Sequence, residues 1–427
     1  MKLKKKIKIN RKNKRMLIIL FLCVVLSSVL VVNVLIPYYK NYMVEKEKEE
    51  YNEIIKNATI IVNLKENLTV EFLDKVKVSD FIDNLNGEIN DDFEVATDTI
   101  GIKEVHFEYT NDEDIVIPYS FEINIKDSTP PEIWLNGYKT MTVGDTDEYL
   151  YEKITCVDNI DDNPKCEIIG NYNLNKAGSY NLKFKATDAS GNTNEKDFTL
   201  YVENPSSGGG GSSGRRVGWD IEEIIRDYKT ENSLIGIDVS SWQGEIDFEQ
   251  VKEAGIDFAI VRVGGTQGID ADYFTDRYFE RNVKGFNEVG IPVGIYFYSY
   301  ANSRENAIKD AKWTIEQIKD YKIDLPVAYD WENWSFFNNF HQSIYSTNMN
   351  AKAFMDTLNE AGYEGMLYGS ANYLKKVWYD MPYPVWLAHY TEHTNYDGKY
   401  KMWQMCSNGK VPGISGFVDV NVLYLDK

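Results

Sequence analysis

Cysteine is scarce in this sequence, with four residues among 427. Cys156 and Cys166 stand close together, whereas Cys23 and Cys406 are isolated. This spacing allows at most one local disulfide, between Cys156 and Cys166, and the alternative is two buried thiols on neighbouring strands. A fold that depends on several disulfides is therefore excluded.

Motifs for metal, phosphate or nucleophilic serine chemistry are also missing. His389 and His393 are four residues apart, but no glutamate follows His389 and the segment before it has a strand pattern, so no helical zinc pair is indicated. Gly264-Gly265 is too short for a phosphate-binding loop, and Ser370 lacks the flanking glycines of a nucleophile elbow. We therefore predict neither a metal nor a cofactor.

A net positive charge is found at one end of the chain, residues 1–15. The net charge is −20, and residues 1–15 contain nine Lys or Arg and no acid, which leaves about −29 for the remainder. A body this acidic would repel nucleic-acid phosphates. We therefore predict that nucleic acid is not a partner.

Long apolar runs are absent after residue 37, but one stands near the start. Residues 16–36 are almost entirely apolar and are long enough for one membrane crossing. Since the basic flank precedes them, we predict a cytoplasmic tail at 1–15, a transmembrane helix at 16–37 and a C-terminal body outside the cell. The alternative, a cleavable signal peptide, lacks small residues at a cleavage site.

Composition and periodicity divide the rest of the chain into five segments. Residues 38–57 are highly charged and predict a solvated helical stalk. Residues 58–126 and 127–203 contain short alternating segments separated by Asn, Asp and Gly, which predict two all-β sandwiches. Residues 204–219 form a Gly/Ser-rich linker. A final domain is predicted at 220–427.

The second β segment resembles the bacterial immunoglobulin-like domains of surface proteins. The resemblance rests on Asp-Ser-Thr-Pro-Pro-Glu-Ile at 127–133, Val-Asp-Asn-Ile-Asp-Asp at 157–162, Ala-Gly-Ser-Tyr at 177–180 and Ala-Thr-Asp-Ala-Ser-Gly-Asn at 186–192. The first β segment is similar to a diverged copy. The resemblance implies a spacer role, with wall binding or a calcium site at Asp158, Asp161 and Asp162 as alternatives.

The final domain alternates apolar strand-like runs with amphipathic helical stretches. Such alternation predicts parallel strands covered by helices, here an α/β, irregular TIM-like (β/α) barrel. Helices are missing between the last runs. The eight runs are residues 234–237, 258–263, 292–298, 325–329, 366–368, 385–388, 402–404 and 417–420.

Acidic residues lie at or just beyond the ends of three of these runs, where the chemistry of a parallel barrel is found: after the first run, after the fourth and within the last. They are Asp238, Asp330, Glu332 and Asp419. Asp330 and Glu332 are two apart, so on an extended backbone both carboxylates face the same side with α-carbons roughly 6–7 Å apart. Trp331 and Trp334 flank this pair, and large rings favour a raised pKa. A close carboxylate pair of this kind is what cleavage of a glycosidic bond requires.

Seven motifs in this domain together resemble the family 25 glycoside hydrolases, which are lysozymes. They lie at residues 235–244, 290–298, 329–332, 368–370, 385–390, 403–404 and 418–421. The resemblance implies a peptidoglycan hydrolase at the bacterial cell wall that cuts the β-1,4 bond between N-acetylmuramic acid and N-acetylglucosamine. It implies Glu332 as general acid, Asp330 as nucleophile or orienter of the substrate N-acetyl group, and Asp238 and Asp419 as the remaining acids.

Aromatic side chains are predicted to bind the glycan, although each is equally suited to fill the barrel. His389 departs from the Gln or Asn that the family pattern predicts. Two other functions compete with the lysozyme hypothesis: a glycan-binding or adhesive surface protein without catalysis, and a chitinase-like glycosidase, whose Asp-x-x-Asp-x-Asp-x-Glu run is missing. The predicted glycan-binding residues are Tyr296, Tyr298, Trp331, Tyr368, Trp386, Tyr390 and Trp403.

Overall fold

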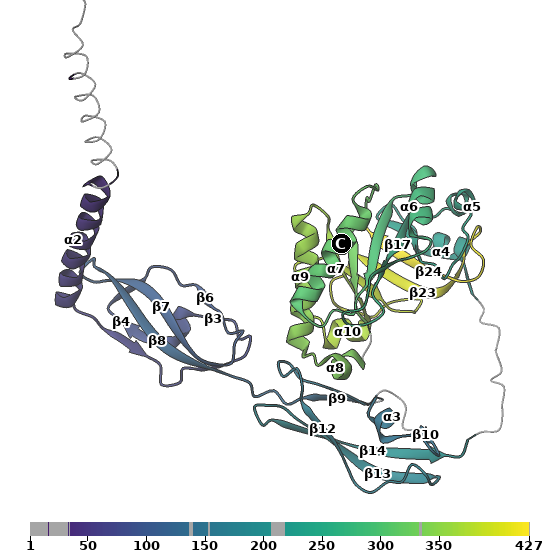
Figure 1. Cartoon of the computed structure of the whole chain (residues 1–427), viewed down its shortest axis with the longest axis horizontal. Helices are drawn as coiled ribbons and strands as arrows, with labels where there is room; N and C mark the ends of the chain where they lie inside the picture. The colour runs from purple at the N-terminus through teal and green to yellow at the C-terminus, as the bar shows by residue number, and fades with distance from the viewer. Residues whose placement is uncertain are drawn as a thin grey trace, which may run out of the picture. The chain divides into compact units, whose positions relative to one another are not determined.

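The computed structural model describes residues 35–135, 140–152, 154–205, 218–332 and 335–426, together with Met16 and Asn33. The predicted transmembrane segment at 16–37 and the linker at 204–219 lie mostly outside these residues, as does Trp334. Within the described residues, no helix is both long and apolar enough to cross a membrane. The chain forms two compact units, residues 1–127 and 128–427 (Figure 1).

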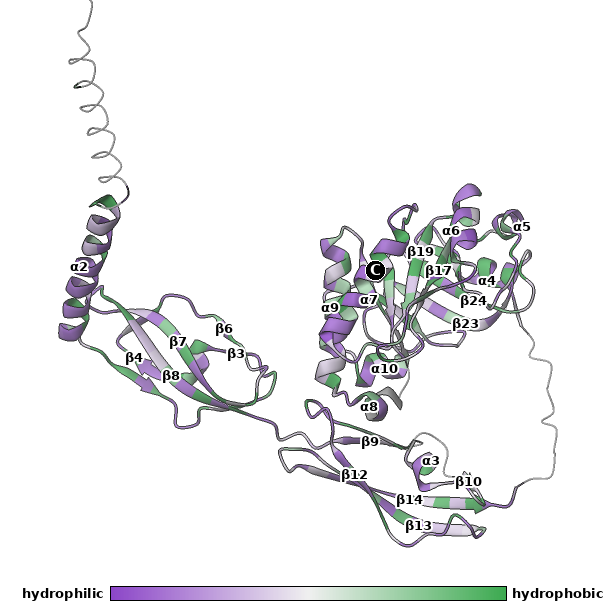
Figure 2. Cartoon of the chain, viewed as in Figure 1, coloured by the Kyte–Doolittle hydropathy of each residue, from purple (hydrophilic) through white to green (hydrophobic). Residues whose placement is uncertain are grey.

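The first unit begins with a polar helix and continues as a β domain. Helix α2 (Ile36–Asn57) buries none of its residues, as a solvated stalk requires, and it is mainly hydrophilic in Figure 2. The elements that follow are β1 (Val62–Leu64), β2 (Thr69–Glu71), β3 (Val76–Lys77), η2 (Val78–Phe81), β4 (Ile82–Leu85), β5 (Gly87–Ile89), β6 (Glu94–Val95), β7 (Gly101–Asn111) and β8 (Val116–Lys126).

The main sheet of this β domain has the order β2-β8-β7-β5, and the pairs β1-β4 and β3-β6 form two smaller sheets. Alternate residues of β7 are buried, namely Val105, Phe107 and Tyr109, which is the pattern of a strand with one face on the core. Phe121 of β8 packs edge-on against Phe107. The long β7–β8 hairpin therefore supplies most of this core.

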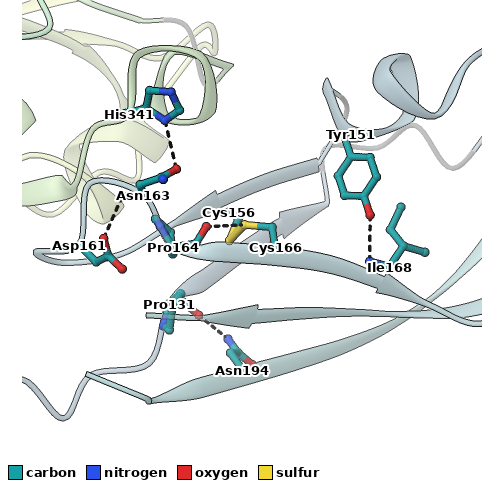
Figure 3. Close-up of a disulfide and its surroundings, with 10 residues drawn as sticks. All are labelled: Pro131, Tyr151, Cys156, Asp161, Asn163, Pro164, Cys166, Ile168, Asn194 and His341. Atoms are coloured by element: carbon teal, nitrogen blue, oxygen red, sulfur yellow. Dashed lines mark hydrogen bonds between the residues drawn. A yellow bond between two sulfur atoms is a disulfide. The ribbon is translucent and has the colours of Figure 1, made fainter. Parts of the chain in front are cut away.

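The second unit begins with another β domain. Its elements are β9 (Glu132–Leu135), β10 (Thr140–Thr142), α3 (Asp147–Glu152), β11 (Ile154–Val157), β12 (Lys165–Ile169), β13 (Gly178–Thr187) and β14 (Thr193–Glu203). A four-stranded sheet, β10-β14-β13-β12, and the pair β11-β9 share one core that includes Ile133, Phe184 and Leu200. Cys156 of β11 and Cys166 of β12 form a disulfide, which joins the two sheets (Figure 3).

The remainder of the second unit is built on a ten-stranded sheet. Its strands are β15 (Trp219–Asp220), β16 (Ser233–Val239), β17 (Phe258–Gly265), β18 (Phe274–Thr275), β19 (Val293–Tyr298), β20 (Val327–Asp330), β21 (Gly365–Ser370), β22 (Val385–Ala388), β23 (Met402–Lys410) and β24 (Val418–Tyr424). Its helices are α4 (Ile221–Tyr228), α5 (Phe248–Glu253), α6 (Phe279–Glu288), α7 (Arg304–Ile318), α8 (Ser335–Phe340), α9 (Ile344–Glu360) and α10 (Ala371–Lys376).

Eight of these strands close into a barrel, because β24 pairs with both β16 and β23. The seven strands from β16 to β23, leaving out β18, run parallel in chain order. The expectation that all eight runs are parallel is wrong for the last, since β24 is antiparallel to both neighbours. The chain between β23 and β24 is too short for a crossover helix, so the two strands form a hairpin.

Side chains alternate between two layers along each barrel strand. The inner layer contains apolar residues such as Ile260, Ala328 and Met366. The outer layer, between strands and helices, contains Ile295 and Phe297 among many others. A polar side chain on the same strand face as Ile260, Ala328 or Met366 therefore points into the barrel.

Candidate active site

Four acidic residues lie on the inner face at one end of the barrel. Asp238 is near the end of β16, Asp330 is the last residue of β20, and Glu332 follows two positions later. Asp419 is near the start of β24, and because this strand runs in the opposite direction, its start lies where the parallel strands end. Asp238 and Asp419 are direct cross-strand partners. The fold thus brings together four residues that are up to 181 positions apart.

The four carboxyl groups influence one another's protonation. Burial is the main cause of a raised pKa at each, to about 6 for Asp238 and about 8 for Asp419, and well above the ordinary value for Asp330. The charge of Asp238 raises the pKa of the other three further. Charges act this strongly only over short distances. The cluster therefore retains protons near neutral pH.

Glu332 differs from the other acids in exposure. Its side chain reaches solvent, whereas Asp238 and Asp330 are each only 7% exposed. The surrounding barrel end still desolvates its carboxyl group, and with the charge of Asp238 this raises the pKa of Glu332. The exposure of the Glu332 side chain and the desolvation of its carboxyl group are compatible, because a side chain can reach solvent and still lie beside buried acids. Glu332 is thus both accessible and able to hold a proton.

Two amide side chains hold Asp238 in place. Gln404 Nε2 and Asn421 Nδ2 donate to the same oxygen, Asp238 Oδ2, over 2.9 and 2.8 Å. The oxygen of Gln404 in turn accepts the Tyr368 and Tyr390 hydroxyls at 3.0 and 3.1 Å. These two amides fix the side-chain position of Asp238 and lower its pKa, against the larger effect of burial.

No role was predicted from the sequence for Gln404 or Asn421. Asn421 is two residues after Asp419, so the alternation of a strand already places both on one face. Arg262 of β17 was not predicted either, and its positive charge lowers the pKa of Asp330. Arg262 pairs with buried Asp276 at 2.6 Å and donates to the Ser241 hydroxyl at 3.1 Å. A lone arginine in an apolar strand was the available signal.

Several of the predicted aromatic residues belong to the same end of the barrel. Tyr296, Tyr368 and Trp386 are in the inner layer, and their rings meet edge-on. Tyr298 pairs in register with Asp330, and the charges of Asp330 and Glu332 raise its pKa. Tyr390 is 58% exposed and lies close enough to Asp419 for that charge to raise its pKa. These five rings surround the acids.

Two predicted glycan-binding residues are elsewhere, and that prediction is wrong for them. Trp331 is fully buried in the outer layer, against Phe337, Tyr373 and Trp378. Trp403 is also in the outer layer and donates its indole N–H to the His389 carbonyl at 2.8 Å. Each is one residue away from an inner-face group, so strand alternation turns it outward.

A cavity of about 900 Å³ opens elsewhere in this domain, between residues 378–384 and 396–401. These segments precede β22 and β23, so the cavity is at the opposite end of the strands from the acids. Its walls are mainly apolar and include none of the four carboxylates. We place the candidate active site at the four acids and not at this cavity. Cleavage of a glycosidic bond needs carboxyl groups with perturbed pKa values, and a large cavity alone does not supply them.

Comparison with known proteins gives matches to this region. Residues 237–414 match the profile of the glycosyl hydrolases family 25. The chain is 30% identical over 191 residues to the autolytic lysozyme of Clostridium acetobutylicum, covering 44% of this chain and 54% of that protein. It is 27% identical over 208 residues to lysozyme M1 of Streptomyces globisporus, covering 44% and 66%.

Among solved structures, the modular autolysin LytC from Streptococcus pneumoniae aligns with 30% identity and a TM-score of 0.40, covering 57% of this chain and 56% of that one. The chain therefore spans about half the length of the C. acetobutylicum and S. pneumoniae proteins that it matches.

Proposed function

We propose that this protein is a peptidoglycan hydrolase, because residues 237–414 match the profile of the glycosyl hydrolases family 25. It cleaves the β-1,4 bond between N-acetylmuramic acid and N-acetylglucosamine. The observation that carries this proposal is the meeting of Asp238, Asp330, Glu332 and Asp419 at one barrel end, with their pKa values raised together. The names of its relatives, an autolytic lysozyme and lysozyme M1, support the same substrate.

Glu332 is the general acid in this proposal. Departure of a sugar requires a proton on the glycosidic oxygen, and a carboxyl group supplies it well when its pKa is raised towards the working pH. Glu332 combines a raised pKa with an accessible side chain. It therefore donates its proton to the leaving oxygen as the bond breaks.

Asp330 stabilises the positive charge that develops on the sugar. Its Oδ1 atom is buried and accepts no hydrogen bond from any residue in the described part of the chain. A buried carboxylate oxygen without such a bond is costly in the free protein, and a ligand group can satisfy it. The positive charge of Arg262 acts against the larger effects of burial, Glu332 and Asp238, which raise the pKa of Asp330. Asp330 acts as nucleophile or orients the substrate N-acetyl group.

Asp238 and Asp419 set the protonation of this pair and hold sugar hydroxyls. Their own pKa values, about 6 and about 8, lie on either side of neutrality, so the cluster changes charge across the physiological range. Tyr296, Tyr368 and Trp386 form the apolar floor on which a sugar ring lies.

The proposal is tested by identifying which bond of peptidoglycan the protein cleaves. Purified peptidoglycan is incubated with the full chain, and the soluble fragments are identified by mass spectrometry after labelling of the new reducing ends. Fragments that end in reducing N-acetylmuramic acid are expected. Fragments that end in reducing N-acetylglucosamine would identify a different glycosidase. Binding to the wall without any release of fragments would favour the adhesive alternative.

The architecture and location are part of the same proposal. We assign the closed barrel to an irregular TIM-like fold, and residues 58–126 and 127–203 to immunoglobulin-like domains. The chain is anchored in the bacterial cytoplasmic membrane through residues 16–37, with the barrel outside facing the wall. The Cys156–Cys166 disulfide supports an oxidising compartment. Protease treatment of intact cells, followed by detection of the barrel, tests this location.

A further inference from the structure

The second β domain and the barrel share a hydrophobic core. Trp134 of β9 and Val157 of β11 belong to the outer-layer cluster of the barrel, whereas their neighbours Ile133 and Cys156 belong to the core of the β domain. The pair β9-β11 is therefore buried on both faces. A strand pair at the edge of a free spacer domain would leave its outer face in water.

This contact reaches the residue between the two principal acids. The Trp134 ring packs against Phe337 of α8 with centroids 5.6 Å apart, and Phe337 packs against Trp331 at 5.1 Å. Both contacts are edge-on, and Lys376 lies over the Trp134 ring at 5.6 Å. Trp331 is fully buried and separates Asp330 from Glu332 in the sequence. Its packing fixes the backbone from which Glu332 projects.

The loop between the two disulfide cysteines contacts the other end of the same segment. We call residues 157–165 the docking loop. It receives the first free N–H groups of α9: Ile344 donates to the Asp158 carbonyl and Tyr345 to the Asn159 carbonyl, each at 2.9 Å. The first N–H groups of a helix have no partner within the helix, so an external acceptor stabilises the start.

Asp162 adds the remaining acceptor at this helix start. Its Oδ1 accepts the Ser343 N–H at 2.7 Å and the Ser343 hydroxyl at 2.6 Å, while the Ser343 hydroxyl oxygen caps Ser346. The Asn163 Oδ1 and His341 Nδ1 atoms are hydrogen-bonded over 3.1 Å (Figure 3). The Cys156–Cys166 disulfide closes the docking loop at its base. The carboxylate of Asp162, one of three proposed for calcium, is thus engaged by Ser343.

We infer that the docking loop and Trp134 are positioning elements of the active site, so that the second β domain is part of the catalytic unit and no mere spacer. They hold both ends of the segment 331–343 that follows Asp330, and they act on Glu332 through Trp331 and the start of α9. This inference rests on the proposed function of Glu332.

The test uses the full chain and four substitutions in the β domain. Asp162→Ala removes the acceptor for Ser343, and Asp162→Asn keeps an acceptor oxygen at the same place. Asp197→Ala is the matched control, since Asp197 is exposed on β14 of the same domain. Trp134→Ala tests the aromatic contact independently. Thermal melting identifies any variant that fails to fold, and Trp134→Ala keeps the test valid if Asp162→Ala does not fold.

Two measurements are combined: kcat and KM on soluble glycan fragments across pH, and amide hydrogen exchange of residues 341–347. Asp162→Ala and Trp134→Ala should each lower kcat about tenfold with KM within about twofold, since a misplaced acid slows the chemical step more than binding. They should also move the alkaline limb of the pH profile. Exchange should speed up in Asp162→Ala, while Asp162→Asn and Asp197→Ala should resemble the wild type.

Faster exchange with unchanged kcat and pH profile would overturn the inference, because the contact would then only hold the domains together. Unchanged exchange in Asp162→Ala would show that the docking loop does not hold α9, which also overturns it. If the wild-type chain released no fragments, the proposed function would fail, and hydrogen exchange would still decide whether the contact exists.

Discussion

The two faces of the barrel wall differ in chemistry although their residues alternate along the same strands. On β19 and β20 the inner face presents Tyr296 and Asp330, and the outer face presents Phe297 and Tyr329. The inner face has acids with raised pKa values, and the outer face has a continuous apolar layer that extends to Trp134 of the second β domain. One face is suited to chemistry and the other to stability.

The difference shows how one short strand serves two purposes. Desolvation raises the pKa of the acids because the apolar layer behind them excludes water and fixes the backbone. The acids weaken the fold in return, since buried charges repel one another. If the two faces are separable, substitutions on the inner face should change activity without loss of stability, and those on the outer face away from Trp331 and its aromatic contacts should do the reverse.

The largest effect is expected for Glu332→Gln on the inner face. The amide keeps the volume and removes the transferable proton, so turnover of peptidoglycan should fall by roughly a thousand-fold. The melting temperature should be unchanged or higher, since one member of a repelling cluster is gone. Release of reducing ends and a thermal melt of the same sample check both parts. Wild-type turnover in this variant would refute the assignment of the acid.

Phe354→Ala on the outer face should give the opposite result. Phe354 of α9 is fully buried and packs on Phe297 and Tyr329. Its truncation should lower the free energy of unfolding by about 3–5 kcal/mol. Denaturant unfolding measures this loss. At a temperature where the variant is folded, kcat should stay within a few-fold of wild type, and a loss as large as that of Glu332→Gln would show that the faces are not separable.

The pH dependence of stability sharpens the comparison further. The folded-state pKa of Asp419 is about 8 against an ordinary 3.8, so the folded chain binds more protons than the unfolded chain between these values. The free energy of unfolding should therefore fall as pH rises from about 4 to about 8. Asp419→Asn should flatten this slope by up to about 1.4 kcal/mol per pH unit. Equal slopes in the two proteins would contradict the raised pKa.

The smallest effect is expected for Gln404→Leu. This change removes one of two amide donors to Asp238, and those donors lower its pKa. The pKa of Asp238 should rise above about 6, and the pH–activity profile should shift upward with a few-fold loss of kcat. The control is Gln250→Leu, a glutamine exposed on α5. A shift of equal size in the control would mean that the effect is not specific to Asp238.

The sequence was sufficient to find most of the strands. Residues 234–237 fall within β16 and residues 385–388 coincide with β22, because buried parallel strands have nearly continuous apolar runs. The antiparallel direction of β24 was not predicted, since an apolar run carries no information on strand direction. The short strands β9 and β11 carry no alternating pattern that would identify them, because both of their faces are buried.

The four acids of the candidate site were predicted because each lies in or just beyond a predicted strand of the barrel. The barrel face on which a neighbouring aromatic ring lies was harder to predict, and Trp331 and Trp403 were assigned to the inner face although they lie on the outer one. Successive side chains of a strand point to opposite faces, so the outward orientation of both tryptophans could have been predicted from their spacing to the inner-face residues. Arg262 and Gln404 could not be found that way, because their roles depend on partners 14 and 166 residues away.

The shared core around Trp134 and Phe337 bears on how such proteins recombine. The family-type segment, residues 237–414, excludes Trp134, Val157 and the docking loop. A gene fusion that moved only that segment to another protein would leave Phe337 uncovered and deprive Ile344 and Tyr345 of their acceptors. The unit that keeps these contacts together is the larger one that begins at Ser128.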